Sequence, residues 1–146
     1  MNNTSAQEAR RAAIAYKRFA QDGKPLHDDR AAKFRAWVDS ELLALPTEVE
    51  RLTSGGSSAS SMPAKNVASR CLAVARALPP EEHARMVLLA ADALLVAARC
   101  PDMASDDSER SRILGKAQVL LSFLKNAPET PTALRSRAIE LVEQLP

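Results

Sequence analysis

Apolar residues recur along this chain at the spacing of α-helices. About 3.6 residues make one helical turn, so apolar residues three or four positions apart form a stripe along one side. Such stripes predict helices over 63–78, from between 105 and 108 through at least 124, and over 131–145. Their apolar positions are Val67, Cys71, Val74, Ala75 and Leu78, then Ile113, Leu114, Ala117, Leu120, Leu121 and Leu124, then Leu134, Ala138, Leu141, Val142 and Leu145.

A fourth predicted helix, from Pro80 to Arg99 or Cys100, has a different pattern. Residues 86–101 read MVLLAADALLVAARCP, and Asp92 is the one charged residue between Met86 and Ala98. On a wheel at about 100° per residue, the polar residues of this helix fall on one line, bordered by leucine and valine. The polar line consists of Glu81, Arg85, Asp92 and Arg99, and its borders are Leu88, Leu89, Leu95 and Val96.

The apolar surface of this segment is wider than the roughly 100° sector that a peripheral helix buries. Either the helix lies centrally, covered by the other helices, or its surplus surface packs on another chain. Asp92 is expected to lie at solvent or to pair with an arginine. The apolar run is too short for a membrane span, which needs about 20 such residues.

Two helices with narrower apolar faces are expected before residue 53. A Ser-x-x-Glu capping box begins the segment 5–22, and Gly-Lys-Pro ends it. The second predicted helix covers 28–45, where Pro46 is expected to end it, because proline removes a hydrogen bond from a helix interior. Together they predict a helical hairpin over 1–52.

A segment rich in serine and glycine, 53–62, follows the predicted hairpin. Its composition is typical of a flexible linker, and an ordinary long surface loop is the alternative. The sequence therefore predicts three parts: the hairpin over 1–52, the linker over 53–62 and a four-helix bundle over 63–146.

Composition supports helix over sheet. Alanine occurs 27 times against four glycines, aromatic residues make up 3% of the chain, and apolar residues make up 46%. Alanine is the best helix former, whereas strands draw on β-branched and aromatic residues. We therefore expect an all-α protein, with a C-terminal antiparallel four-helix bundle preceded by an N-terminal helical hairpin.

Charge is nearly balanced overall but uneven along the chain. The net charge is +2, and residues 1–35 hold eight basic against four acidic residues, whereas residues 36–52 hold one basic and four acidic residues. The basic N-terminal segment offers a candidate nucleic-acid contact, since cationic side chains bind phosphates. Its candidate residues are Arg10, Arg11, Lys17 and Arg18.

Catalytic and ligand-binding motifs are not recognisable in the sequence. His27 and His83 have no second ligand at helical spacing, and Cys71 and Cys100 form no CxxC pair. We therefore expect no enzymatic activity, cofactor, metal or small-molecule substrate. The cysteines are expected to be reduced core thiols, and a disulfide between neighbouring helices is the alternative.

The expected compartment is the cytoplasm, because no apolar segment of the signal-peptide type follows the start. The polar opening also suits an export signal of a specialised injection system. Abundant alanine and arginine suggest a bacterial or mobile-element origin.

The expected function is that of a helical protein–protein interaction module: an adaptor, inhibitor, chaperone or immunity-type protein. Its partner is a protein or a second copy of the chain, and no membrane is expected as a partner. A nucleic-acid-binding regulatory protein is the alternative. The candidate interface comprises the borders of the polar line and two aromatic residues: Leu88, Leu95, Val96, Phe34 and Trp37.

Overall fold

The structure is a computed structural model that describes residues 28–54 and 60–146. Within these residues the protein is all-helical, as the composition predicted, and no strand is present. The five α-helices and one 3₁₀ helix are α2 (Asp28–Ser54), α3 (Met62–Ala75), α4 (Pro80–Ala98), η1 (Pro101–Met103), α5 (Asp107–Asn126) and α6 (Thr132–Glu143). The predicted helix over 5–22 lies outside the described residues.

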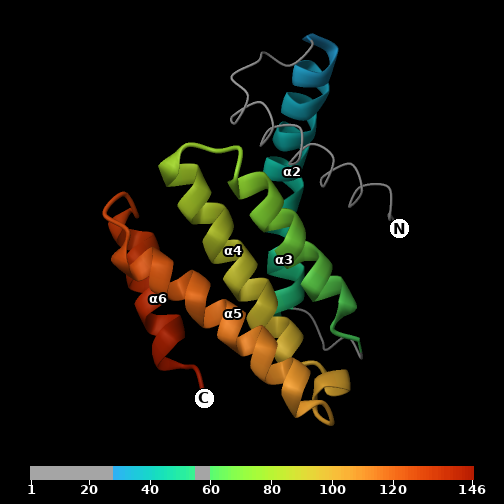
Figure 1. Cartoon of the computed structure of the whole chain (residues 1–146), viewed down its shortest axis with the longest axis vertical. Helices are drawn as coiled ribbons and strands as arrows, with labels where there is room; N and C mark the ends of the chain where they lie inside the picture. Colours follow the sequence, from blue (N-terminus) through green and yellow to red (C-terminus); the bar gives the residue numbers. More distant parts are fainter. Residues whose placement is uncertain (1–27, 55–59) are drawn as a thin grey trace.

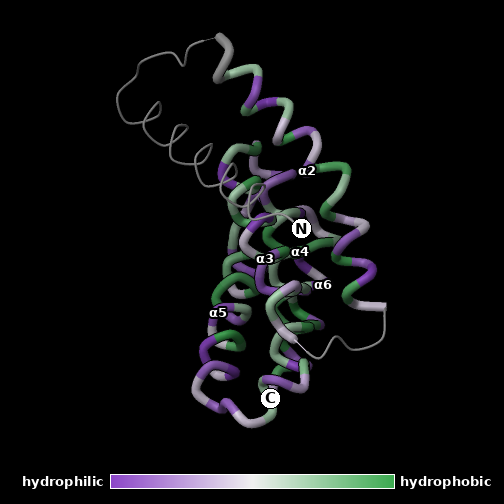
Figure 2. The backbone as a smooth tube through the Cα atoms, turned by 90° about the vertical axis from the view of Figure 1, so that its right-hand side faces the viewer, coloured by the Kyte–Doolittle hydropathy of each residue, from purple (hydrophilic) through white to green (hydrophobic). Residues whose placement is uncertain are grey.

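Helix α4 lies at the centre of this fold (Figure 1). It contacts α2 and α3, which also contact each other, and it contacts α5 and α6, which likewise form a pair. The helices thus form two groups of three that share α4. Figure 2 shows α2 and α5 on opposite sides of the molecule.

This central position explains why α4 is apolar around most of its circumference. Ala91 and Ala93 point to nearly opposite sides of the helix, and neither has any exposed surface. Of the two alternatives for this segment, coverage by helices of the same chain is therefore the one observed. No helix within the described ranges has the length and apolar character needed to cross a membrane.

Helix α2 corrects the expectation that Pro46 ends a helix. The helix continues through Pro46 to Ser54, which lies two residues inside the predicted linker. Pro46 is exposed, whereas Leu45 and Val49 on either side of it are buried. An interior proline costs about 3 kcal/mol, and burying each large aliphatic side chain returns roughly 1.5–3 kcal/mol. Packing on α3 and α4 therefore outweighs the local cost.

Helix ends are stabilised by side chains from neighbouring elements. The Asp102 carboxylate in η1 accepts hydrogen bonds from the backbone N–H and the hydroxyl of Ser61, at 3.0 and 2.9 Å, where α3 begins. His83 Nδ1 in α4 donates to the Ala75 carbonyl, at 2.7 Å, where α3 ends. Arg135 in α6 donates to the carbonyl of Ala127, which follows α5. These contacts satisfy backbone groups that a helix leaves free at its ends.

Helix boundaries follow the predictions to within a few residues elsewhere. Helix α4 ends at Ala98, and α5 begins after Asp106. The Asp106 side chain caps α5 by accepting a hydrogen bond from the backbone N–H of Glu109. Helix α3 ends three residues before the predicted Leu78, with turns in place of further helix. Pro131 occupies the N-cap position of α6, so the helix begins at Thr132, one residue after the predicted start.

Candidate interaction surfaces

The polar line predicted for α4 is largely at the surface. Its members Glu81, Arg85 and Arg99 are exposed, and Asp92 is half-buried. Of the predicted interface residues beside it, Leu88 is buried within the chain, and Leu95 and Val96 are half-buried against its core. Leu88 thus has little apolar surface left for a partner, whereas Leu95 and Val96 keep part of theirs.

Asp92 is neither fully exposed nor paired. Its oxygen atoms are not among the buried polar atoms without a partner, and among the described residues no ion pair includes it. Partial burial raises the pKa of this carboxyl, and the positive charges of Arg137 in α6 and Arg99 oppose the rise. Partial burial therefore disfavours the ionised form of Asp92, and the two arginines offset this effect only in part.

Arg70 joins α3 to α2 through two carboxylates. Its guanidinium forms a bidentate contact with Glu41, with both N–O distances at 2.8 Å, and donates to Glu48 at 3.0 Å. Glu48 Oε2 also lies 2.8 Å from Arg70 Nη2, in ion-pair contact without hydrogen-bond alignment. Glu41 is 6% exposed. The hydrogen bond that Arg70 donates to Glu41 is the largest of the effects that raise the pKa of Arg70 above its ordinary value.

The charge cluster of Arg70, Glu41 and Glu48 was not predicted from the sequence. Glu41 and Glu48 are seven residues apart, so they share the side of α2 that carries Leu45. Two carboxylates on an apolar helix face were the available signal, but the arginine that pairs with them lies on another helix.

Phe34 and Trp37, the aromatic residues of the predicted interface, pack on each other in α2. Their ring centroids are 6.1 Å apart, and both side chains are half-buried. The Trp37 Nε1–H is buried and has no hydrogen-bond partner in the described structure. The predicted nucleic-acid contacts Arg10, Arg11, Lys17 and Arg18 lie outside the described residues.

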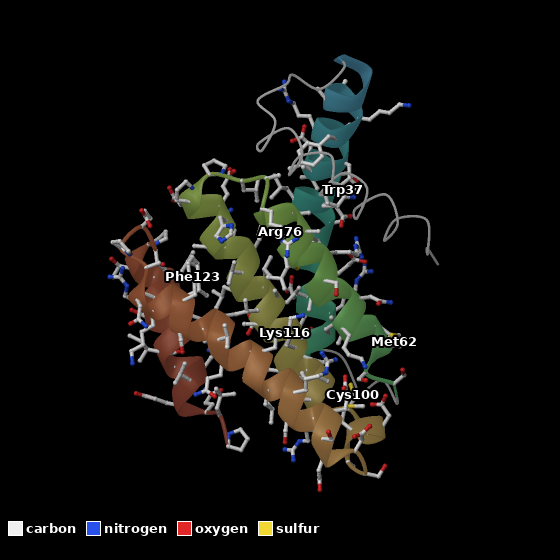
Figure 3. The ribbon with its side chains drawn as sticks, viewed as in Figure 1. Trp37, Met62, Arg76, Cys100, Lys116 and Phe123 are labelled. Carbon is white, nitrogen blue, oxygen red and sulfur yellow. The ribbon has the colours of Figure 1, made fainter. Side chains whose placement is uncertain are left out.

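The outer face of α5, defined here by Lys116, Val119 and Phe123, was not predicted. Val119 is 68% exposed and Phe123 is 47% exposed, one helical turn apart, and Lys116 is exposed beside them. The Phe123 ring meets His83 of α4 edge-on, with centroids 5.7 Å apart. Figure 3 shows Phe123 and Trp37 on different helices, well separated. The signal in the sequence was that Val119 and Phe123 fall outside the buried stripe of α5.

The two cysteines are buried and free. Burial raises the pKa of the Cys71 thiol to about 12, so this thiol is almost entirely protonated at neutral pH. The Cys100 thiol lies 3.4 Å from the Val96 carbonyl, to which it donates, and burial also raises its pKa.

Compared with protein-family models, curated protein sequences and solved structures, the chain matches none of them.

Proposed function

We propose that this protein is a non-enzymatic helical interaction module that binds a protein partner or a second copy of itself. The observation that carries the proposal is the outer face of α5. Val119 and Phe123 present adjacent apolar side chains to solvent on a rigid helix. Adjacent exposed apolar residues are typical of protein-binding surfaces, and aromatic residues often supply the central anchor.

The surface for this role has changed from the sequence-based expectation. Leu88 lies inside the fold, so α5 becomes the principal candidate, and the half-buried Leu95 and Val96 of α4 stay candidates beside it. Phe34 and Trp37 on α2 stay candidates for a second contact. Leu43 on α2 is 82% exposed but is the one large exposed apolar residue of its helix, and such single residues are common on protein surfaces.

We also propose the finer organisation expected from the sequence, with a four-helix bundle over 63–146 behind a hairpin over 1–52. Its support is that α3, α5 and α6 all pack on α4, and that α2 packs on α3 and α4.

The function is tested with the variant Val119→Gln/Phe123→Gln, and Leu43→Gln is the matched control. We expect the parent chain and the control to bind the same protein in affinity capture from native cells. Light scattering then reports self-association. The α5 variant should lose binding or self-association at least tenfold, because truncated interface anchors typically cost about 2 kcal/mol or more.

Circular dichroism has to show that the α5 variant keeps its helical content, since Phe123 also contacts His83. A folded α5 variant that binds and associates like the parent chain refutes the proposal. Salt-sensitive binding to DNA or RNA, lost when Arg10, Arg11, Lys17 and Arg18 are changed to Gln, would support the alternative nucleic-acid function instead.

A further inference from the structure

Helix α2 is held to the rest of the described fold mainly by contacts with two helices, α3 and α4. It is 27 residues long; its buried side chains lie between Val38 and Val49, and Phe34, Trp37 and Leu52 on either side pack on the same core while half-exposed. It packs on α3 and α4, while α5 and α6 pack together on α4. The helices α3 to α6 therefore keep most of their mutual contacts if α2 is removed.

Part of this interface is polar. Arg70 of α3 binds Glu41 and Glu48 of α2, and the Arg70 side chain is 20% exposed. When the two helices separate, water can solvate all three charged groups again. The ion pairs therefore contribute less to the free energy of docking α2 than apolar contacts over the same area would. With these ion pairs, α2 is attached less strongly than it would be through an apolar interface of the same size, which favours reversible separation.

Cys71 follows Arg70 directly in α3. Its thiol has no exposed surface and feels the charges of Glu41 and Glu48 as well as that of its neighbour Arg70. Departure of α2 removes these two carboxylates from the thiol and gives water access to this part of α3. Cys71 is therefore a natural reporter of whether α2 is in place.

We propose that α2 is a detachable helix: it leaves α3 and α4 as a unit while α3 to α6 stay folded, and it uncovers the part of α3 around Arg70 and Cys71. The uncovered surface combines a cation with apolar side chains, and its occupant in the closed state is α2, an amphipathic helix with two carboxylates seven residues apart. This inference does not depend on the outer face of α5.

The test is thiol labelling of the full chain in a Cys100→Ser background, at increasing urea concentrations below the unfolding transition. The docked Cys71 thiol is buried and protonated, so labelling reports the open form. We expect a free energy of opening below that of global unfolding. Its urea dependence should also be smaller, but not zero, because the opening exposes one helix interface rather than the whole core.

Variants of the ion cluster identify α2 as the moving part. Glu41→Gln leaves Arg70 with one carboxylate, and labelling of Cys71 should accelerate about 10- to 100-fold. Glu50→Gln is the matched control, because Glu50 lies on the exposed side of the same helix, and it should change the rate less than about twofold. If Glu41→Gln does not fold, Glu48→Gln, whose side chain is 35% exposed, should give a smaller acceleration.

Two results overturn the proposal. In one, labelling of Cys71 gives the free energy and the urea dependence of global unfolding, or it shows no urea dependence at all. In the other, Glu50→Gln accelerates labelling as much as the variants of the ion cluster.

Discussion

Three consecutive residues of α4, Ala91, Asp92 and Ala93, differ in their surroundings. Ala91 and Ala93 have no exposed surface, and Asp92 between them is half-buried on the polar line. At about 100° per residue, Ala91 and Ala93 point to nearly opposite sides of the helix. A helix at the edge of a fold buries one side, whereas a central helix buries both. Leucine at each position in turn distinguishes these cases.

The expected cost of Ala91→Leu or Ala93→Leu follows from the packing. Each change adds three carbon atoms at a position where the alanine has no exposed surface. Overpacking of this kind costs about 1–3 kcal/mol. For a chain of this size, each kcal/mol lowers the Tm by about 2–4 °C, so each variant should lose about 2–12 °C. Asp92→Leu removes a partly desolvated carboxylate at the surface, so its stability at neutral pH should equal or exceed that of the parent chain.

Urea unfolding and thermal unfolding followed by circular dichroism measure these changes. Parent chain, Ala91→Leu, Asp92→Leu and Ala93→Leu are compared at equal concentration, and the urea dependence shows whether unfolding stays cooperative. If either alanine variant is as stable as the parent chain, α4 is not enclosed on that side. If Asp92→Leu is the least stable of the three, the assignment of the polar line to the surface is wrong.

Two further predictions concern pH. The Arg112 guanidinium hydrogen-bonds Glu109 and holds the pKa of this carboxyl at about 2, so the stabilisation is present above the ordinary carboxylate range and is lost as pH falls towards that value. In Arg112→Gln, a carboxyl titration by NMR should return the pKa towards its usual range, and an unchanged midpoint would contradict this. The pKa of Asp92 is raised by burial, so its contribution is greatest below the ordinary pKa of aspartate and is lost as pH rises through the raised pKa. Asp92→Asn should therefore flatten the fall in unfolding free energy from acidic to neutral pH; an equally steep fall in the variant would point to another group.

Much of the helical framework was predictable from local pattern. Asp106 and the acidic residues after it mark the start of α5, and Pro80 marks the start of α4, because these residue types favour the first turn. The central position of α4 was one of two alternatives from its apolar width. Deciding between them needed the contacts with α2, α3, α5 and α6.

Pro46 and Arg70 show where local pattern is insufficient. Proline correctly predicts a local cost, but packing of Leu45 and Val49 on other helices decides that the helix continues. Arg70 looks like any surface arginine in the sequence, and its role depends on two carboxylates of another helix. Contacts between distant parts of the chain carry no local signal.

Val119 and Phe123 show a different limit. The apolar stripe of α5 correctly identified Ile113, Ala117 and Leu121 as core, and all three are buried. The same stripe implies that Val119 and Phe123 lie off the core, but composition gives no reason to examine apolar residues outside it. Exposed apolar residues became candidates only once their burial was known.

The position of α4 also has a consequence for folding. Its most extensive contacts are with α3 and α5, the helices directly before and after it in the chain. Such contacts close short loops, and proteins dominated by them fold in microseconds to milliseconds. Folding can therefore start at the junction of α3 with α4 or at that of α4 with α5. In either case α4 belongs to the first structure formed, and the helices at both ends of the described chain are added to it.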